Sequence, residues 1–345
     1  MKRLSQQTIA QELGVSQALV SLCLRGKRQG IADATYERVR AYAQEHGYRL
    51  GGEGMSAVPN GLATVGYLLR KPLRIAHGSN FFHPVHQGMH DQLREHGLHT
   101  TFLGSEDEVD VSALVQRLSS DPNYAGTIVL GQVEMGFLQR LAEVPRPLVT
   151  INARYPGLCH SVQPNEVEAA DLLAQHLILL NHREILYLGS EQPSAISEAR
   201  LAAFQWAARK HGLDLPPARC FQAPWSLRHH GRELARQILE RQGRSFGSAW
   251  VCVGSLLARG VVDELQRQGL RVGEDISIAT LDDSPAAAEE EPCLTSAGTS
   301  PEDLGREAAS LILNEGRTRP THKIDLVLPA RLQARQSTWV RHESK

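Results

Sequence analysis

The sequence predicts an α/β protein with a small helical head and a larger body in which parallel β-sheets are covered by helices. From Leu62 onward, β-rich runs such as LATVGYLL, GTIVLG, SAWVCVG and DISIAT alternate with amphipathic helical runs. This alternation is typical of parallel sheets that are buried on both faces. Residues 1–49 show three short helical patterns instead. We therefore expect domains at residues 1–49 and 63–345, joined by a linker at residues 50–62.

The body is too long for a single sheet of this kind. About 280 residues follow the linker, so we predict a two-lobed, doubly wound core. Lobe one is expected at about residues 63–160 and 298–325, and lobe two at about 161–297 and 326–340. In such folds a ligand binds at the carboxyl ends of the strands, which here means between the two lobes.

Charge is distributed unevenly along the chain, although the net charge is −1. Residues 1–50 carry eight Lys and Arg side chains against four Asp and Glu, and the remaining residues carry 29 against 34. A basic head on a slightly acidic body favours contact between the head and a polyanion.

The composition excludes several classes of protein. No run approaches the about 18 apolar residues that a membrane span needs, and the first residues lack the apolar region of a signal peptide. The five cysteines contain no C-x-x-C spacing, which argues against a disulfide framework or a structural zinc site. We therefore expect a cytoplasmic protein with no membrane partner and no cofactor.

The head has the pattern of a helix-turn-helix. Residues 4–13 form an amphipathic helical run, and Gly14 supplies the left-handed conformation that often follows a helix end. Ser16 is then a good N-cap for a second helix, QALVSLCL. A third helix follows the basic loop RGKRQG, with Tyr36, Val39 and Ala43 facing the core. In this motif the second helix enters the DNA major groove.

The head resembles the DNA-binding headpiece of the LacI/GalR family of bacterial transcription regulators. The matching residues are Thr8-Ile9-Ala10, Gly14-Val15-Ser16, Ile31 with Thr35 and Val39, and Gly47-Tyr48. The resemblance implies that Gln17 and Ala18 read bases. Where the family commonly has a guanine-reading arginine, this chain has Leu22, which offers only apolar contact, for example to a thymine methyl group. The other expected DNA contacts are Ser5, Gln6, Ser16, Ser21, Arg25, Lys27 and Arg28, most of them to phosphates.

The linker departs from the family pattern. In the family this segment folds into a hinge helix whose leucine wedges into the minor groove. Here Ala57 stands at the leucine position, and each of Gly51, Gly52 and Gly54 costs a helix about 1 kcal/mol relative to alanine. We predict a flexible tether with little wedging, with Met55 as a substitute wedge.

The body resembles the same family in four segments. In chain order they are NHREILYLG, the arginine-containing helix ISEARLAAFQWAARKHG, the D-D segment GEDISIATLDDSP, and EPCLTSAGTSPEDLGREAASLIL. The family's core is similar to periplasmic sugar-binding proteins, so the resemblance implies ligand binding and no enzymatic activity. It places an effector between the lobes, with contacts from Arg70, Asn152, Arg200, Trp225 and Asp282.

One departure complicates the choice of effector. Family members usually have Asn-Asp where this chain has Gly254-Ser255, so a carboxylate that grips sugar hydroxyls is missing. A sugar or sugar derivative is the expected effector. An anionic molecule, a less hydroxylated molecule and a degenerate pocket are the alternatives. His83, His86 and His90 share one helix side, but no Cys or carboxylate cluster supports a metal site.

Together these features predict a sequence-specific transcription regulator, with repression as the expected sense. Its partners are double-stranded DNA with a pseudo-palindromic operator, a small-molecule effector and a second copy of the chain in a homodimer. The alternatives are a solute-binding sensor whose head binds a protein, and an enzyme on a periplasmic-binding-like scaffold. The sequence lacks the P-loop and G-x-G-x-x-G motifs with which NTPases and dinucleotide-binding enzymes begin.

Overall fold

The computed structural model describes residues 6–24, 31–45, 63–71, 81–191, 195–242, 247–318 and 322–341. The chain divides into two compact units, Met1–Gly61 with Asn314–Arg319 and the remainder. Every expectation about the linker at residues 50–62 falls outside the described residues.

The head contains the predicted helices α1 (Gln6–Leu13), α2 (Gln17–Leu24) and α3 (Asp33–Glu45). Gly14 has a φ of 64°, and the Leu19 amide donates to Ser16 Oγ over 3.2 Å, so the turn and the cap are as predicted. The helices meet in one core formed by Ile9, Ala10, Val20, Cys23, Leu24, Tyr36, Val39 and Ala43.

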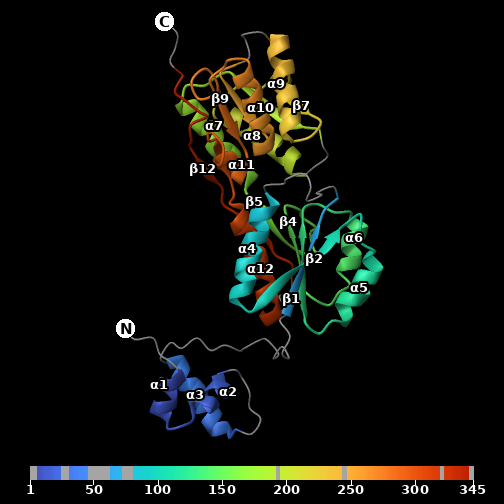
Figure 1. The fold of residues 1–345 in the computed structure, drawn as a ribbon, viewed down its shortest axis with the longest axis vertical. Helices are drawn as coiled ribbons and strands as arrows, with labels where there is room; N and C mark the ends of the chain where they lie inside the picture. Colours follow the sequence, from blue (N-terminus) through green and yellow to red (C-terminus); the bar gives the residue numbers. More distant parts are fainter. Residues whose placement is uncertain are drawn as a thin grey trace. The chain divides into compact units, whose positions relative to one another are not determined.

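Lobe one contains a six-stranded sheet among the described residues, in the order β11-β5-β4-β3-β1-β2. Its strands, all paired in parallel, are β1 (Ala63–Leu69), β2 (Leu98–Ser105), β3 (Tyr124–Leu130), β4 (Leu148–Ile151), β5 (His160–Pro164) and β11 (Asp325–Leu328). Its helices are α4 (Phe82–Glu95), α5 (Val111–Ser120), α6 (Met135–Leu141) and α12 (Pro301–Thr318). Helices α4 and α12 cover one face of the sheet, and α5 and α6 cover the other (Figure 1).

Close contact between α4 and α12 depends on two glycines. A side chain on Gly88 would overlap the carbonyl group of Glu302, and one on Gly305 would overlap the carbonyl group of Val85. The two helix backbones therefore approach each other closely because neither glycine has a Cβ. This contact fixes a late segment of the chain against an early one.

Lobe two contains a second six-stranded sheet among the described residues, in the order β12-β10-β9-β8-β6-β7. Its strands are β6 (Ile185–Ser190), β7 (Cys220–Ala223), β8 (Ala249–Cys252), β9 (Ser277–Thr280), β10 (Thr295–Gly298) and β12 (Arg331–Gln333). Among the described residues, β10 and β12 pair antiparallel, and the other pairs of neighbouring strands are parallel. Its helices are α7 (Glu166–Leu179), α8 (Ala195–Lys210), α9 (Arg228–Gln242), α10 (Ser255–Arg267) and α11 (Pro285–Ala288), with a 3-10 turn at Pro217–Arg219. The predicted two-lobed α/β architecture is confirmed.

The chain passes between the two sheets at Asn165, near Thr299 and just after Leu328. These segments are joined by hydrogen bonds: the Asn165 amide donates to Leu328 O over 3.1 Å and lies 3.3 Å from Thr299 Oγ1. The first and last crossings lie a few residues later than the lobe boundaries expected near residues 160 and 325, because β5 and β11 complete the first sheet. The carboxyl ends of the strands in each sheet therefore lie near these crossings.

No helix in the described part of the chain is long and apolar enough to cross a membrane.

Candidate functional site

The start of α2 is the exposed part of the helix-turn-helix. Ser16, Gln17 and Ala18 are exposed, whereas Ser21 and Leu22 are half-buried one turn later. The Ser16 hydroxyl oxygen is used as the cap of α2, and its hydrogen can still be donated to a phosphate. Gln17 and Ala18 therefore lie on the part of the helix from which a recognition helix contacts base edges.

Other expected DNA contacts lie outside the described residues. These are Ser5, the side chain of Gln6, Arg25, Lys27 and Arg28. Their roles remain predictions.

The five expected effector residues lie near the carboxyl ends of strands, in both lobes. In lobe one, Arg70 follows β1 and Asn152 follows β4. In lobe two, Trp225 and Asp282 follow β7 and β9, and Arg200 lies on α8, which follows β6. The carboxyl ends of parallel strands form the usual ligand-binding edge of such sheets.

The two residues in lobe one offer polar groups to a ligand. Asn152 has a φ of 59°, a left-handed conformation that asparagine tolerates, and its buried Oδ1 has no hydrogen-bond partner among the described residues. Arg70 packs against Gly131, where any Cβ would meet the arginine side chain. Burial lowers the pKa of Arg70, and the nearby Glu106 carboxylate partly opposes this effect. A donor and an acceptor are thus present at this edge.

Arg200 forms a buried ion pair that the sequence did not predict. Its Nε donates to Glu166 Oε2 over 2.9 Å, and its Nη1 donates to the Val253 carbonyl oxygen over 2.8 Å. The side chains of Arg200 and Glu166 are only 11% and 9% exposed. Arg200 is therefore not a surface ion-pair former; it belongs to the interior of the carboxyl edge of lobe two.

Burial and charge act in opposite directions on this pair. Burial raises the pKa of Glu166, and Arg200 opposes this rise. Burial disfavours the charged form of Arg200, but Glu166 and Asp282 outweigh it and hold the pKa of Arg200 above its usual value. Asp282 lies at the same edge: its Oδ2 is 3.1 Å from the position of a Cβ on Gly254, the residue after Val253, whose carbonyl oxygen accepts from Arg200.

Asp282 is tied to the residue that replaces the family's aspartate. Its carboxylate accepts hydrogen bonds from the Ser255 amide over 2.9 Å, from Ser255 Oγ over 2.6 Å and from the Ser284 amide over 3.0 Å. Ser255 is the first residue of α10, so Asp282 also satisfies the start of that helix. Asp282 follows β9, and much of its hydrogen-bonding capacity is used within the protein.

Trp225 is 40% exposed, close to the 42% of Trp206 on α8. It lies in the segment between β7 and α9. An exposed indole at the carboxyl end of a strand provides a flat apolar face for the ring of a ligand.

Sequence reasoning missed Glu166 and Tyr187, and it interpreted Ser255 only as the loss of a carboxylate. Glu166 follows the helix-capping Asn165, so its sequence context indicates only a favourable acidic residue in a first helical turn. The Tyr187 hydroxyl is buried with no hydrogen-bond partner in the described part of the protein, and burial raises its pKa well above the usual value. No periodic pattern links either residue to Arg200.

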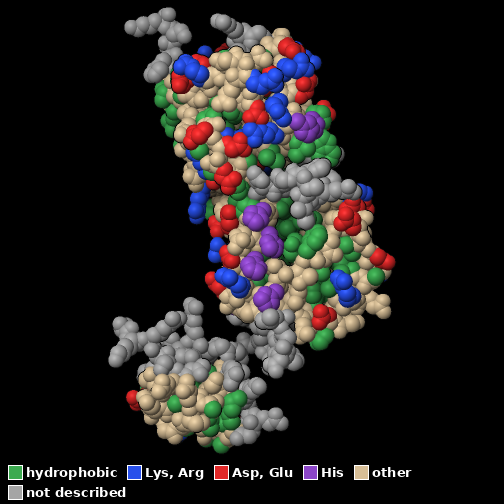
Figure 2. Space-filling model, viewed as in Figure 1, with side chains coloured by type: hydrophobic (Ala, Val, Ile, Leu, Met, Phe, Trp, Pro, Cys, Tyr) green, Lys and Arg blue, Asp and Glu red, His purple; other side chains and the backbone are tan. Residues whose placement is uncertain are grey.

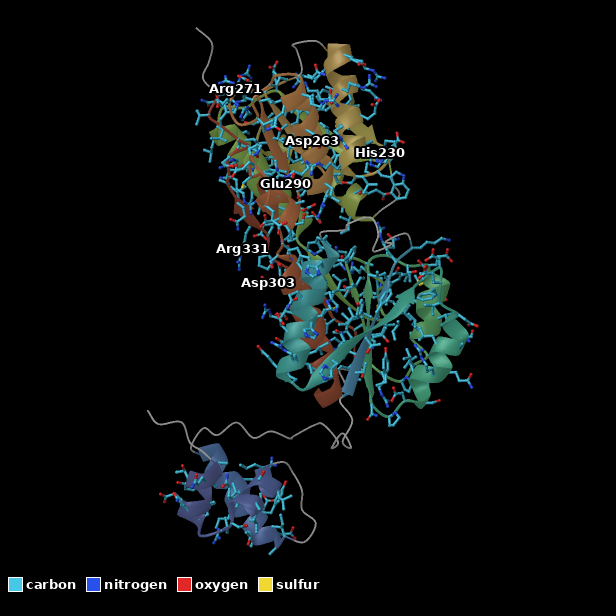
Figure 3. The ribbon with its side chains drawn as sticks, in the orientation of Figure 1. His230, Asp263, Arg271, Glu290, Asp303 and Arg331 are labelled. Atoms are coloured by element: carbon cyan, nitrogen blue, oxygen red, sulfur yellow. The ribbon has the colours of Figure 1, made fainter. Side chains whose placement is uncertain are left out.

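A cavity of about 530 Å³ lies elsewhere, beyond the C-terminal end of α10. It is lined by residues such as Gln266, Arg271 and Gln336, and none of the expected effector contacts lines it. Arg271 lies at the end of lobe two remote from Arg331, which follows a crossing segment (Figure 3). Asp275 and Glu274 already pair with Arg271, so the cavity presents no uncompensated charge from that side chain.

Histidine side chains gather over lobe one (Figure 2). The rings of His86 and His90 stack at 6.1 Å, and Thr100 Oγ1 lies 3.3 Å from His86 Nε2. No group of three metal-ligating side chains is positioned to hold an ion in the described ranges.

The chain matches a family model over part of its body, and it is similar to known proteins over nearly its whole length. A family model described as a periplasmic binding protein-like domain matches residues 174–338. The maltose regulon regulatory protein MalI of Escherichia coli K12 is 28% identical over 352 residues, covering 96% of this chain and 98% of MalI.

Solved structures share the fold, among them two that cover nearly the whole chain. The complex of the transcriptional regulator CelR with cellobiose has a TM-score of 0.68 and 24% identity, covering 97% of this chain and all of that one. The lac repressor dimer bound to operator and the anti-inducer ONPF has a TM-score of 0.67 and 18% identity, covering 98% and 100% of the two chains. The head and the body therefore occur together in the same order in known regulators.

Proposed function

Because the chain belongs to the LacI/GalR family of bacterial transcription regulators, we propose that its head binds a specific DNA sequence and that a small molecule bound by its body changes that affinity. The exposed start of α2, held by the Gly14 turn and the Ser16 cap, carries this proposal. In this arrangement Gln17 and Ala18 read bases, while serine and basic side chains of the head fix the register on phosphates.

The proposed active form is a homodimer that represses transcription. Two heads present two α2 helices to the half-sites of a pseudo-palindromic operator, because the symmetry of the protein is matched by that of the DNA. The lac repressor structure, a dimer on its operator, supports this arrangement. A transcription regulator acts on the bacterial chromosome, so we place this protein in the cytoplasm. We assign it a binding role and no catalytic role.

The proposed effector is a sugar or sugar derivative. The CelR structure holds cellobiose, and the carboxyl edges of this chain's sheets carry the polar groups that hydroxyls need. Arg200 and Asp282 would contact hydroxyls, Trp225 would stack on the sugar ring, and Arg70 and Asn152 would contact the ligand from lobe one.

A footprint and a salt titration test the DNA-binding proposal. The full chain should protect a symmetric site near its own gene and should bind it at least about 1000-fold more tightly than random DNA of equal length. Affinity for both DNAs should fall with salt, because Lys and Arg side chains release counterions from the phosphates. Equal affinity for the two DNAs at every salt concentration would exclude sequence-specific regulation.

Trp225 fluorescence tests the effector proposal. Addition of the effector should change the emission of the wild-type chain. Trp225→Phe should lose most of the change, because Trp250 is fully buried and the exposed Trp206 lies against Lys210 at the C-terminal end of α8. Arg200→Ala should abolish the effect of the effector on operator binding. An operator response that survives Arg200→Ala unchanged would place the effector elsewhere.

A further inference from the structure

The buried ion pair in lobe two leaves several hydrogen-bonding groups unused. A guanidinium has five N–H donors, and Arg200 uses one on Nε for Glu166 and one on Nη1 for Val253. Within the described ranges, Nη2 donates to no protein group. Arg200 therefore keeps donors for a further molecule while its charge is already balanced.

Glu166 keeps an acceptor beside these donors. Its Oε2 takes the hydrogen bond from Arg200, and its Oε1 is buried without a partner in the described part of the chain. A buried carboxylate oxygen that accepts no hydrogen bond costs free energy, so a donor from a ligand would be strongly favoured there. The orphaned Tyr187 hydroxyl, whose pKa responds to both Arg200 and Glu166, is a third polar group in the same region.

These groups match a hydroxyl better than they match an anion. A hydroxyl can donate to Glu166 Oε1 and accept from Arg200, so two neighbouring hydroxyls on one ligand satisfy both groups. A phosphate or carboxylate only accepts, and it would leave Oε1 without a donor. It would also add a negative charge next to Glu166 and Asp282, which outnumber Arg200 at this edge of lobe two, while Arg70 of lobe one already interacts with Glu106.

We propose that Glu166 determines effector specificity by neutralising Arg200 and offering Oε1 to a ligand hydroxyl, so that the pocket selects a neutral polyhydroxylated ligand and rejects its phosphorylated or carboxylated counterpart. This inference rests on the proposed function of the chain as a sugar-responsive regulator. It makes Glu166 a contact residue that works together with Arg200.

The test compares matched pairs of neutral and anionic sugars. Calorimetry on the full chain uses glucose against glucose 6-phosphate and glucuronate, ribose against ribose 5-phosphate, and cellobiose. The variants are Glu166→Gln and, as a matched control, Glu198→Gln, which removes the same charge from an exposed position on α8. Thermal melting of each variant checks that it is folded.

The wild-type chain should bind a neutral member at least about tenfold more tightly than its anionic counterpart, because like charges in a partly buried site repel. Glu166→Gln should reduce that preference about tenfold or reverse it, and Glu198→Gln should leave it unchanged. If Glu166→Gln does not fold, Glu166→Asp replaces it. That variant should keep the discrimination against anions but bind the neutral sugar more weakly, because its carboxylate is one methylene shorter.

Three results would overturn the inference. If the wild-type chain prefers an anionic sugar that also shifts operator affinity, the proposed regulator stands and the role of Glu166 is wrong. The role is also wrong if the preference is the same in wild type and Glu166→Gln. If no sugar of the set binds and operator affinity never changes, the sugar-responsive function itself fails, and the inference fails with it.

Discussion

Replacement of Gly88 by alanine should weaken lobe one, because the α4–α12 contact has no room for a methyl group. The added Cβ would overlap the Glu302 carbonyl oxygen and lie 2.8 Å from the carbonyl carbon, whereas ordinary contacts begin at 3.4 Å. The obstacle is the backbone of α12, so the two helices must separate by roughly 1 Å or more.

Two opposing contributions set the magnitude. Forcing extra volume into a packed contact costs about 1–3 kcal/mol, and an alanine in a helix recovers about 1 kcal/mol relative to glycine. Since a backbone yields less readily than a side chain, we expect a net loss of about 2 kcal/mol in the free energy of unfolding. For a body of this size that corresponds to a Tm lower by about 4–8 °C.

The assay is thermal and urea unfolding of the full chain, followed by circular dichroism. Gly136→Ala is the matched control, because Gly136 is also helical, on α6, and no atom of a neighbouring residue lies within 4 Å of the position that an added methyl group would take. It should leave the Tm unchanged or slightly higher. Equal stability of Gly88→Ala and wild type, or an equal loss in both variants, would refute the packing argument.

Three further predictions concern the head and lobe two. Gln17→Ala should weaken binding to the specific site about 5–150-fold, the effect of losing a base contact worth about 1–3 kcal/mol, and leave affinity for random DNA unchanged in the same anisotropy assay. Val20→Ala should destabilise the head by about 2 kcal/mol, because Val20 is fully buried in its core, and calorimetry should show this loss without a change in the melting of the body. Burial lowers the pKa of His182 to about 4, so between pH 4 and 6.5 the unfolded chain binds a proton that the folded chain resists. The free energy of unfolding should therefore be highest above pH 6.5 and should fall as the pH drops toward 4. Urea titrations should show a shallower fall for His182→Gln. An equally steep fall in that variant would contradict the assignment of this pH dependence to His182.

The head could be predicted from sequence because its signals are local. The Gly14 turn, the Ser16 cap and the buried positions of α3 follow from the conformational freedom of glycine, from side-chain capping and from the helical period. The alternation of strands and helices likewise predicted two parallel sheets. Short strands such as β5 and β7 were missed, because four or five residues carry too little periodicity to stand out.

The effector region was predictable only in part. Arg200 and Asp282 were placed through the family motifs, and both lie near the carboxyl edge of lobe two. The pairing of Arg200 with Glu166 was not predicted, because it joins residues on different helices and depends on how α7 and α8 pack. Likewise, the bonds from Ser255 to Asp282 link two strand ends that the sequence alone does not bring together.

The most direct test of the account is the affinity of the full chain for its operator, measured by anisotropy with and without a neutral sugar at one salt concentration. The account predicts that the chain binds its operator at least about 1000-fold more tightly than a random duplex of equal length. It also predicts that the operator affinity changes at least about fivefold when the effector is added. Equal affinity for operator and random DNA, or an operator affinity that no ligand of the body changes, would contradict it.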